Sequence, residues 1–347
     1  MTTTAPPAAL HDVIAALAYG RELAQEEISG AFDVIMRGDA SAVQISALLT
    51  GLRVRGETAD VVAGAAQALR RAMVRLELPN PDGVVDTCGT GGGAIGTFNI
   101  STAAALVAAG AGVRIAKHGN RSFTSRSGSA DVLEALGVSV DVSLESMRHA
   151  FDTAGIVFMY APRMHPAMRH VGPVRRELAV PTVMNVIGPL ANPASAGRQV
   201  VGVADPARLT VIAEALAALG TVHSLVVHGE PGMDEISPIG CTRVLEIRDS
   251  TVTEWTITPE VIGSVGATAA DLIGGSPAEN AALVEHCLSG NAPAGAVAAV
   301  IANAGAAIYV AGLARSYAEG LNAARAAVAN GSATAALRRL RHALPRS

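Results

Sequence analysis

Apolar side chains recur at helical spacing in the first part of the chain. Between residues 10 and 76 they follow one another at intervals of three and four positions, as in Ile28, Phe32 and Ile35, and this period is typical of amphipathic helices. We expect no strand in this region. The expected helix boundaries are two capping hydroxyls and two terminal glycines: Ser41, Thr58, Gly38 and Gly56. The pattern predicts a small all-helical N-terminal subdomain.

The pattern changes after the turn sequence Asn80-Pro81-Asp82-Gly83. Short apolar runs then alternate with helical segments, which is typical of parallel α/β sheets. From about residue 277 to residue 344 the chain is helical again. The expected strands lie at residues 84–85, 113–116, 156–160, 199–203 and 225–228, followed by a hairpin of residues 242–247 and 251–257 that turns at Asp249-Ser250. The fold class is therefore α/β, with a larger domain built on a mostly parallel sheet flanked by helices.

A proline-rich connection interrupts this alternation. Prolines from Pro162 to Pro193 break an otherwise helical pattern into short helices and loops. We expect the connection to cross back to the helical subdomain. The predicted division is a helical subdomain at residues 1–80, completed by helices within about residues 163–192, and an α/β domain at residues 81–162 and 193–347.

Composition narrows the class of function. Half of the 347 residues are hydrophobic and 16% are charged, as in a well-buried globular protein, and the formal net charge is −4. Such a charge gives no overall basic field for nucleic acid, and the 3% of aromatic residues supply no stacking platform. The three cysteines are widely spaced without a CxxC pair, which argues against a disulfide framework or a zinc site.

One uncharged stretch, residues 294–314, is long enough to cross a bilayer. It consists mostly of alanine and glycine and carries Asn303 near its middle, so we interpret it as a helix buried in the α/β core. The N-terminal residues lack a basic and an apolar signal region. We expect a cytoplasmic protein without a membrane partner.

Glycines crowd the loop after the first expected strand. The loop then enters a helix near Asn99, and glycine lets backbone N–H groups approach an anion at such a helix N-terminus. The spacing Gly89-x-Gly91-x-x-Ala94 matches a dinucleotide fingerprint, but the second strand ends in Lys117 rather than in an acid that would bind a ribose. A tight turn without a ligand is the alternative, and we favour a phosphate site.

The loop from Lys117 to Ser129 follows the second strand and holds four basic or potentially basic groups and five hydroxyls. A solvated surface loop is the alternative interpretation. Because the carboxyl ends of neighbouring parallel strands meet at one edge of a sheet, we expect this loop to face the glycine loop. Function is favoured for Lys117 and Asn120, whereas Arg121 could instead be a structural ion-pair partner.

Two further groups of residues carry candidate chemistry. Asp234 and Glu235 follow a strand and could hold Mg²⁺ together with the hydroxyl of Ser101, because Mg²⁺ takes a few carboxylates plus substrate phosphates. Arg175 could bind a carboxylate through its planar guanidinium, or be an ordinary surface arginine. The nearby histidines, His165 and His170, are interpreted as structural.

Four motifs occur in order along the chain: GTGG…GTFNIST, KHGNRS…SGSADVLEALG, PVRREL…NVIGPLANP and GMDEIS. In this combination the chain resembles the anthranilate phosphoribosyltransferase family nearly from end to end. The resemblance implies a nucleoside-phosphorylase-like fold and a homodimer, formed through the helical subdomain. It also implies a step of tryptophan biosynthesis, in which anthranilate and phosphoribosyl pyrophosphate (PRPP) give N-(5-phosphoribosyl)anthranilate and pyrophosphate.

The same resemblance assigns residues. The implied metal ligands, for two Mg²⁺ ions, are Ser101, Asp234 and Glu235. The implied anthranilate contacts are Gly89, Asn120 and Arg175, with Arg175 on the carboxylate. His118 is a candidate proton relay, although the amine needs no strong base once it is bonded to ribose C1. The implied PRPP contacts are Gly89, Gly92, Thr97, Asn99, Ile100, Ser101, Thr102, Lys117, His118, Gly119, Asn120, Arg121, Ser122, Ser125 and Ser129.

The chain departs from the family pattern in its glycine loop. The family sequence GTGGD here ends in Gly93, so an acid is missing. We expect this change to weaken one Mg²⁺ interaction without abolishing catalysis. Arg126 stands where lysine is common, which preserves charge but not geometry.

Two rival functions remain open at this point. A pyrimidine nucleoside phosphorylase would share the fold, but the KHGN and GMDE motifs argue against it. A non-catalytic paralogue that binds nucleic acid would be expected to lose the acidic pair and gain a basic surface, and this chain does neither. Consumption of PRPP with and without anthranilate separates these possibilities.

Overall fold

The computed structural model describes residues 10–122 and 126–346. The α-helices are α1 (Leu10–Ala18), α2 (Gln25–Arg37), α3 (Ala42–Arg55), α4 (Ala59–Ala72), α5 (Ile100–Gly110), α6 (Ser129–Ala135), α7 (Leu144–Ala154), α8 (Ala161–Met164), α9 (Gly172–Leu178), α10 (Leu209–Ala218), α11 (Pro259–Ile262), α12 (Pro277–Leu288), α13 (Ala294–Val310), α14 (Tyr317–Ala329) and α15 (Ser332–Ala343). Short 3₁₀ helices are η1 (Pro81–Gly83), η2 (Pro166–His170), η3 (Val183–Asn185), η4 (Pro206–Arg208) and η5 (Ala269–Leu272). The strands are β1 (Val85–Gly89), β2 (Ile115–Gly119), β3 (Ile156–Tyr160), β4 (Arg198–Gly202), β5 (His223–Gly229), β6 (Thr242–Arg248) and β7 (Thr251–Ile257).

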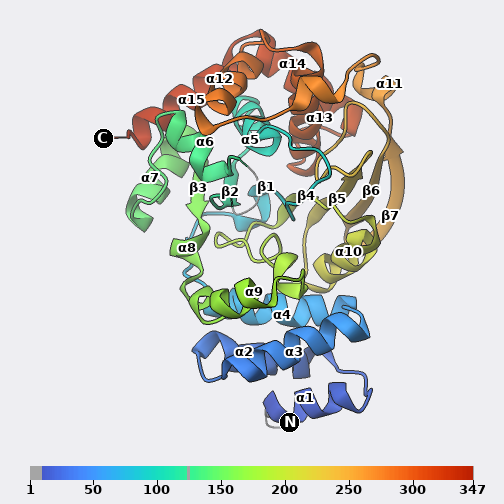
Figure 1. The fold of residues 1–347 in the computed structure, drawn as a ribbon. Helices are drawn as coiled ribbons and strands as arrows, with labels where there is room; N and C mark the ends of the chain where they lie inside the picture. Colours follow the sequence, from blue (N-terminus) through green and yellow to red (C-terminus); the bar gives the residue numbers. More distant parts are fainter. Residues whose placement is uncertain (1–9, 123–125, 347) are drawn as a thin grey trace.

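The four helix boundaries predicted in the N-terminal part lie where the sequence places them. The hydroxyls of Ser41 and Thr58 accept hydrogen bonds from backbone amides three residues later, at 3.3 and 3.4 Å. Gly38 and Gly56 end α2 and α3 with φ angles of 84° and 95°, a region that favours glycine. The predicted caps and helix ends are confirmed, and α1–α4 form the helical layer at the bottom of Figure 1.

Seven strands form one sheet in the order β3-β2-β1-β4-β5-β6-β7. The first five are parallel, and β6 and β7 join as antiparallel strands. All predicted strands are present, and Asp249 and Ser250 turn the final hairpin with φ angles of 50° and 61°, as a two-residue primed turn requires. The predicted fold class is therefore confirmed.

Successive residues of the central strands point into two different cores. Val200 and Leu225 face a core that they share with α5 and α13, whereas Val201 and Val226 face a core that they share with α4 and α10. Figure 1 shows the sheet lying between the C-terminal helices α12–α15 and the N-terminal helices. Both faces of the parallel part are covered, as such sheets require.

Helix α13 is the uncharged stretch that the sequence assigns to the core. It packs against α5 and α14, and Asn303 at its middle is buried. Within the described part of the chain, no helix has the length and apolarity to cross a membrane.

The proline-rich connection lies against the N-terminal helices. Helix α9 contacts α3, and η2 contacts α2 and α4. A partly buried ion pair joins the loop between α3 and α4 to η4, since Arg208 Nη2 lies 2.8 Å from the carboxylate of Glu57. Arg70 of α4 donates to the carbonyl of Leu190 across 2.7 Å. The two layers thus meet through charged as well as apolar contacts.

Candidate active site

The carboxyl ends of β1, β2 and β5 bring three predicted loops to one edge of the sheet. β1 lies between β2 and β4, although β4 follows it by more than a hundred residues in the sequence. The loop after β1 carries the glycines, the loop after β2 carries the basic residues, and the loop after β5 carries the acidic pair. Ligands of open α/β sheets bind at such an edge.

The glycine loop is in direct contact with Asp234. The N–H of Gly91 donates to the Asp234 carboxylate across 2.8 Å, and Gly91 and Gly92 have φ angles of 70° and 81°. A Cβ at Gly89 would lie 2.6 Å from the Asp234 carboxylate, and a Cβ at Gly202 would collide with its carbonyl. The acidic loop can approach the strand ends this closely because both positions lack a side chain.

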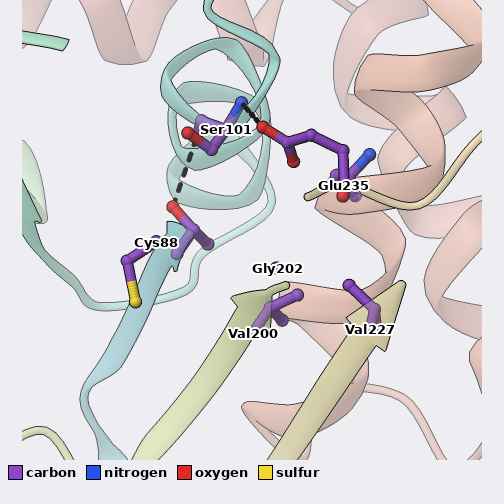
Figure 2. A pocket seen from close by; sticks show the side chains of 8 residues that line it. Cys88, Ser101, Val200, Gly202, Val227 and Glu235 are labelled. Carbon is purple, nitrogen blue, oxygen red and sulfur yellow. Dashed lines mark hydrogen bonds between the residues drawn. The ribbon is translucent and has the colours of Figure 1, made fainter. Parts of the chain in front are cut away.

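Ser101 joins Glu235 to Lys117. The N–H of Ser101, in the first turn of α5, donates to the Glu235 carboxylate across 3.2 Å. The ammonium of Lys117 donates to the hydroxyl of Ser101 across 3.1 Å and also to the carbonyl of Thr87. Figure 2 shows Ser101 and Glu235 together above the ends of the strands. These residues were predicted from three separate motifs, and the structure brings them together.

Burial perturbs the charges of this cluster. It raises the pKa of Asp234, and together with the neighbouring Asp234 charge it raises the pKa of Glu235 to about 8. Burial lowers the pKa of Lys117 and raises that of Asp86 to about 6, although the charge of Lys117 partly opposes the latter shift. Two crowded carboxylates with raised pKa values are a place where a bound cation would be stabilised.

The donor set suits Mg²⁺ held together with a phosphate ligand. Asp234, Glu235 and Ser101 supply the oxygen atoms that this ion prefers. Across residues 10–122 and 126–346, no group of three or more His, Cys, Asp and Glu side chains is arranged as a complete metal cage. Mg²⁺ usually needs only one or two carboxylates, with the remaining positions filled by phosphate and water, so the residues fit this ion.

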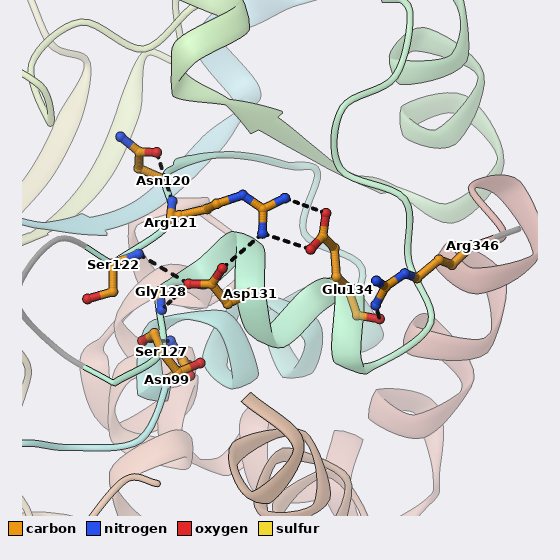
Figure 3. A network of polar contacts seen from close by, with 9 residues as sticks. All are labelled: Asn99, Asn120, Arg121, Ser122, Ser127, Gly128, Asp131, Glu134 and Arg346. Atoms are coloured by element: carbon orange, nitrogen blue, oxygen red, sulfur yellow. Dashed lines mark hydrogen bonds and ion pairs between the residues drawn. The ribbon is translucent and has the colours of Figure 1, made fainter. Parts of the chain in front are cut away.

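The loop after β2 is held by an ion-pair network (Figure 3). Arg121 lies 3.0 Å from Asp131 and 2.6 Å from Glu134 of α6, and Ser122 donates its N–H to Asp131 across 3.2 Å. Arg121 thus forms structural ion pairs, which was the alternative to a role in ligand binding. Ser125 lies outside the described residues.

A pocket of 680 Å³ opens beside this cluster. Gly89, Asn120 and Arg175, the three residues predicted to contact one substrate, all line it. Arg175 is half-buried, and burial lowers its pKa. Since burial alone, and no acidic group of the described residues, shifts the pKa of its guanidinium, the pocket offers a cation to a ligand carboxylate.

Two histidines meet at the wall of this pocket. The ring centroids of His118 and His165 lie 4.8 Å apart. Burial lowers the pKa of His118 well below its ordinary value and that of His165 to about 4, so both rings are neutral at pH 7. His165, interpreted from the sequence as structural, lines this pocket, whereas His170 packs against Gly38 of the helical layer.

Comparison with known proteins identifies the family. Residues 81–334 match the family described as glycosyl transferase family, a/b domain, and residues 11–73 match its helical bundle domain. The chain is 49% identical over 330 residues to the anthranilate phosphoribosyltransferase of Rubrobacter xylanophilus, covering 95% of this chain and 96% of that protein. The chain belongs to the anthranilate phosphoribosyltransferase family.

Other anthranilate phosphoribosyltransferases agree in sequence and fold. The protein from Geobacillus kaustophilus is 44% identical over 96% of this chain and 97% of its own length. The crystal structure of the Thermus thermophilus protein has a TM-score of 0.90 at 43% identity, covering 96% of this chain and 99% of that one. The Saccharomyces cerevisiae protein, solved in complex with PRPP and Mg, has a TM-score of 0.85 at 28% identity, covering 96% and 97%.

Two buried asparagines near this site were not predicted as functional residues. Asn192 donates to Asp86 across 2.7 Å and to the carbonyl of Ala116 across 2.9 Å. Asn303 of α13 accepts from the N–H of Ile236 at 2.9 Å and donates to its carbonyl at 3.1 Å, next to Glu235. For Asn303 the available signal was a polar side chain inside an uncharged helix, because a buried amide needs partners.

The departure from the family pattern at Gly93 lies beside the acidic pair. A Cβ at this position would lie 3.2 Å from the carbonyl of Gly232 and 3.3 Å from the Asp234 carboxylate. An aspartate here, as in the GTGGD sequence of anthranilate phosphoribosyltransferases, would therefore add a third carboxylate next to Asp234.

Proposed function

We propose that this chain transfers the phosphoribosyl group of PRPP to the amine of anthranilate, releasing pyrophosphate, in tryptophan biosynthesis. The observation that carries the proposal is that the glycine loop, the start of α5 and Lys117 of the second loop meet at one acidic pair. Gly91 donates to Asp234, Ser101 donates to Glu235, and Lys117 donates to the hydroxyl of Ser101. This junction lies beside the pocket that Arg175 lines. Family membership supports the same reaction.

PRPP would bind between the glycine loop and the loop from Lys117 to Ser129. Its phosphates would meet backbone N–H groups at the start of α5 and the ammonium of Lys117. Two Mg²⁺ ions held by Ser101, Asp234 and Glu235 would neutralise charge on the departing pyrophosphate. The described residues contribute mainly by positioning and by electrostatic stabilisation.

Anthranilate would occupy the pocket with its carboxylate on Arg175. Asn120 and Gly89 would then orient the ring so that the amine faces ribose C1. His118 is a suitable proton acceptor, because its neutral ring can take the proton that the amine loses after bonding to C1. His165 lies against His118 and would hold it in place.

We further propose a cytoplasmic homodimer formed through the helical subdomain. Tyr19, Val43 and Val54 are 91%, 78% and 80% exposed. The two valines are eleven residues apart on α3 and therefore lie on the same helix face. An apolar stripe on this outer face is what an isologous dimer contact requires. The division into a subdomain at residues 1–80 with helices of about residues 163–192, and an α/β domain for the rest, is supported by the packing of residues 167–191 against α1–α4, in a core to which α10 and one face of β4–β6 also contribute.

The loss of anthranilate fluorescence on addition of PRPP and Mg²⁺ tests the reaction. Arg175→Ala should raise the KM for anthranilate by about tenfold to a hundredfold, because a charged hydrogen-bond partner is lost. Arg176→Ala, from the same pocket, is the matched control and should change this KM less. The double variant Asp234→Ala/Glu235→Ala should lose turnover. Absence of anthranilate consumption by the wild-type protein at every Mg²⁺ concentration would refute the proposal.

A further inference from the structure

Residues 272–274, shortly before α12, hold the glycine loop through backbone hydrogen bonds. The N–H of Phe98 donates to the carbonyl of Leu272 across 2.9 Å, and the N–H of Gly274 donates to the carbonyl of Gly96 across 2.8 Å. A Cβ at Gly274 would lie 2.7 Å from the carbonyl oxygen of Thr97. The backbone of the glycine loop is thus fitted against residues 272–274.

Asn280, in the first turns of α12, extends this support to a side chain of the loop. It is 2% exposed. Its Oδ1 accepts the N–H of Gly275 at 2.7 Å, and its Nδ2 donates to Oδ1 of Asn99 across 2.9 Å. Asn99 in turn donates its Nδ2 to the carbonyl of Ser127 across 3.1 Å. Figure 3 shows Asn99 next to Ser127, at the base of the loop that follows β2.

The hydrogen bond between Gly275 and Asn280 fixes the donor and acceptor of every later bond in this series of amides. The N–H of Gly275 can only donate, so the Asn280 oxygen faces it and the Asn280 nitrogen faces Asn99. The Asn99 oxygen is therefore occupied as an acceptor, and its nitrogen is directed at the Ser127 carbonyl. A reversed Asn99 amide would place two oxygens against each other at Ser127 and two nitrogens at Asn280.

We propose that Asn280 is a positioning residue for PRPP. It sets the orientation of the Asn99 amide and thereby joins the glycine loop to the loop from Lys117 to Ser129. This inference rests on the proposed function, since it concerns the two loops that would hold PRPP. Asn280 acts through Asn99, and the anthranilate pocket has neither residue in its wall.

Asn280→Asp tests this role with almost no change in shape. The aspartate keeps an acceptor for Gly275 but replaces the donor toward Asn99 with a second oxygen. We expect the KM for PRPP to rise about tenfold or more, while the KM for anthranilate changes less than twofold. In an Asn99→Ala background the same substitution should add little, because the group through which it acts is gone. Equal increases in both KM values, or full additivity with Asn99→Ala, would show that Asn280 is only structural.

Ser276→Ala is the matched control for local destabilisation of α12. Ser276 lies four residues before Asn280 and caps this helix, because its hydroxyl accepts the N–H of Glu279. Its alanine variant should lower Tm without changing the KM for PRPP. If Asn280→Asp proves too unstable to assay, Asn280→Ser removes the reach to Asn99 without adding charge and should give the same selective increase. An unchanged KM for PRPP in a folded Asn280→Ser protein would contradict the proposal.

Measurements of PRPP binding distinguish the positioning role of Asn280 from the proposed reaction. PRPP titrated with Mg²⁺ into the wild-type protein and into Asn280→Asp in a calorimeter should show weaker binding to the variant, whether or not anthranilate is consumed. Wild-type binding of PRPP without turnover would refute the proposed reaction and leave the positioning role in place. Equal PRPP affinity of the two proteins would refute the positioning role alone.

Discussion

The ammonium of Lys117 lies 3.1 Å from the hydroxyl of Ser101. The lysine is 3% exposed, and it is the only lysine among the 26 cationic lysine and arginine residues of the chain. A guanidinium is larger and planar, so it could not occupy the space between Thr87 and Ser101 in the same way. A metal ion at Ser101 would lie close to this positive charge, whereas the phosphates of PRPP would be attracted by it.

Lys117→Gln should therefore change metal and PRPP binding in opposite directions. Without PRPP, Mn²⁺ used as a spectroscopic substitute for Mg²⁺ should bind a few-fold more tightly, because a nearby like charge is removed. PRPP should bind at least about tenfold more weakly. Electron paramagnetic resonance and calorimetry measure the two affinities. Lys117→Arg keeps the charge and should still bind PRPP poorly; weaker binding of both Mn²⁺ and PRPP to the glutamine variant would contradict this account.

Gly93→Asp should lower the Mg²⁺ concentration that gives half-maximal activity. The new carboxylate would lie beside Asp234 and strengthen attraction for the cation by roughly several-fold. Gly93→Asn fills the same space without charge and should leave the Mg²⁺ dependence close to that of the wild type. An identical Mg²⁺ profile for the aspartate variant would remove the idea that Gly93 weakens a metal interaction.

The apparent Mg²⁺ affinity should rise with pH. Burial and the Asp234 charge raise the pKa of Glu235 to about 8, so this carboxyl is protonated at pH 7 and must lose its proton when metal binds. Below pH 8 the affinity should approach a tenfold increase per pH unit, and above pH 8 it should level off. Half-saturating Mg²⁺ measured between pH 6.5 and pH 9 checks this slope. Glu235→Gln cannot release the proton, so its profile should be flatter; an equally steep profile would assign the proton to another group.

His165 should make the fold sensitive to acid. Burial lowers its pKa to about 4, below the ordinary value of 6.5. The unfolded chain therefore binds the proton more readily between these values, so stability is present above pH 6.5 and is lost as the pH falls toward 4. At pH 5 the loss is about 2 kcal/mol relative to pH 7.

Urea unfolding at pH 5 and pH 7 measures this loss. His165→Gln removes the titrating ring and should lose less stability over the interval than the wild type. His149, on the outer side of α7, is the matched control, and His149→Gln should lose as much as the wild type. The prediction fails if the two variants respond to acid alike.

Periodicity predicted most of the fold because its physical causes are local. The caps at Ser41 and Thr58, the turn at Asp249-Ser250 and each strand follow from residues within a few positions of one another. The two loops expected to bind phosphate were also recognisable, because glycines and basic residues come directly after strands.

The hydrogen-bond and ion-pair partners of the site residues were not predictable from local sequence patterns. The bond from Gly91 to Asp234 spans 143 residues, and the bond from Asn280 to Asn99 spans 181. Arg121 could be matched with Asp131 and Glu134 only once α6 was placed beside its loop. His165 lies beside His118 in the pocket wall because the proline-rich connection packs there, which depends on tertiary contacts rather than on its neighbours in the sequence.

The buried, solitary lysine gives this protein a built-in chemical reporter. Apart from the terminal α-amino group, Lys117 carries the chain's only aliphatic amine. Because Lys117 is buried, an acylating reagent could reach it only if the loops around Ser101 opened, and the rate constant of its modification would then measure how often they do. Occupancy by a ligand would then appear as protection of a single peptide in mass spectrometry, with no engineered label.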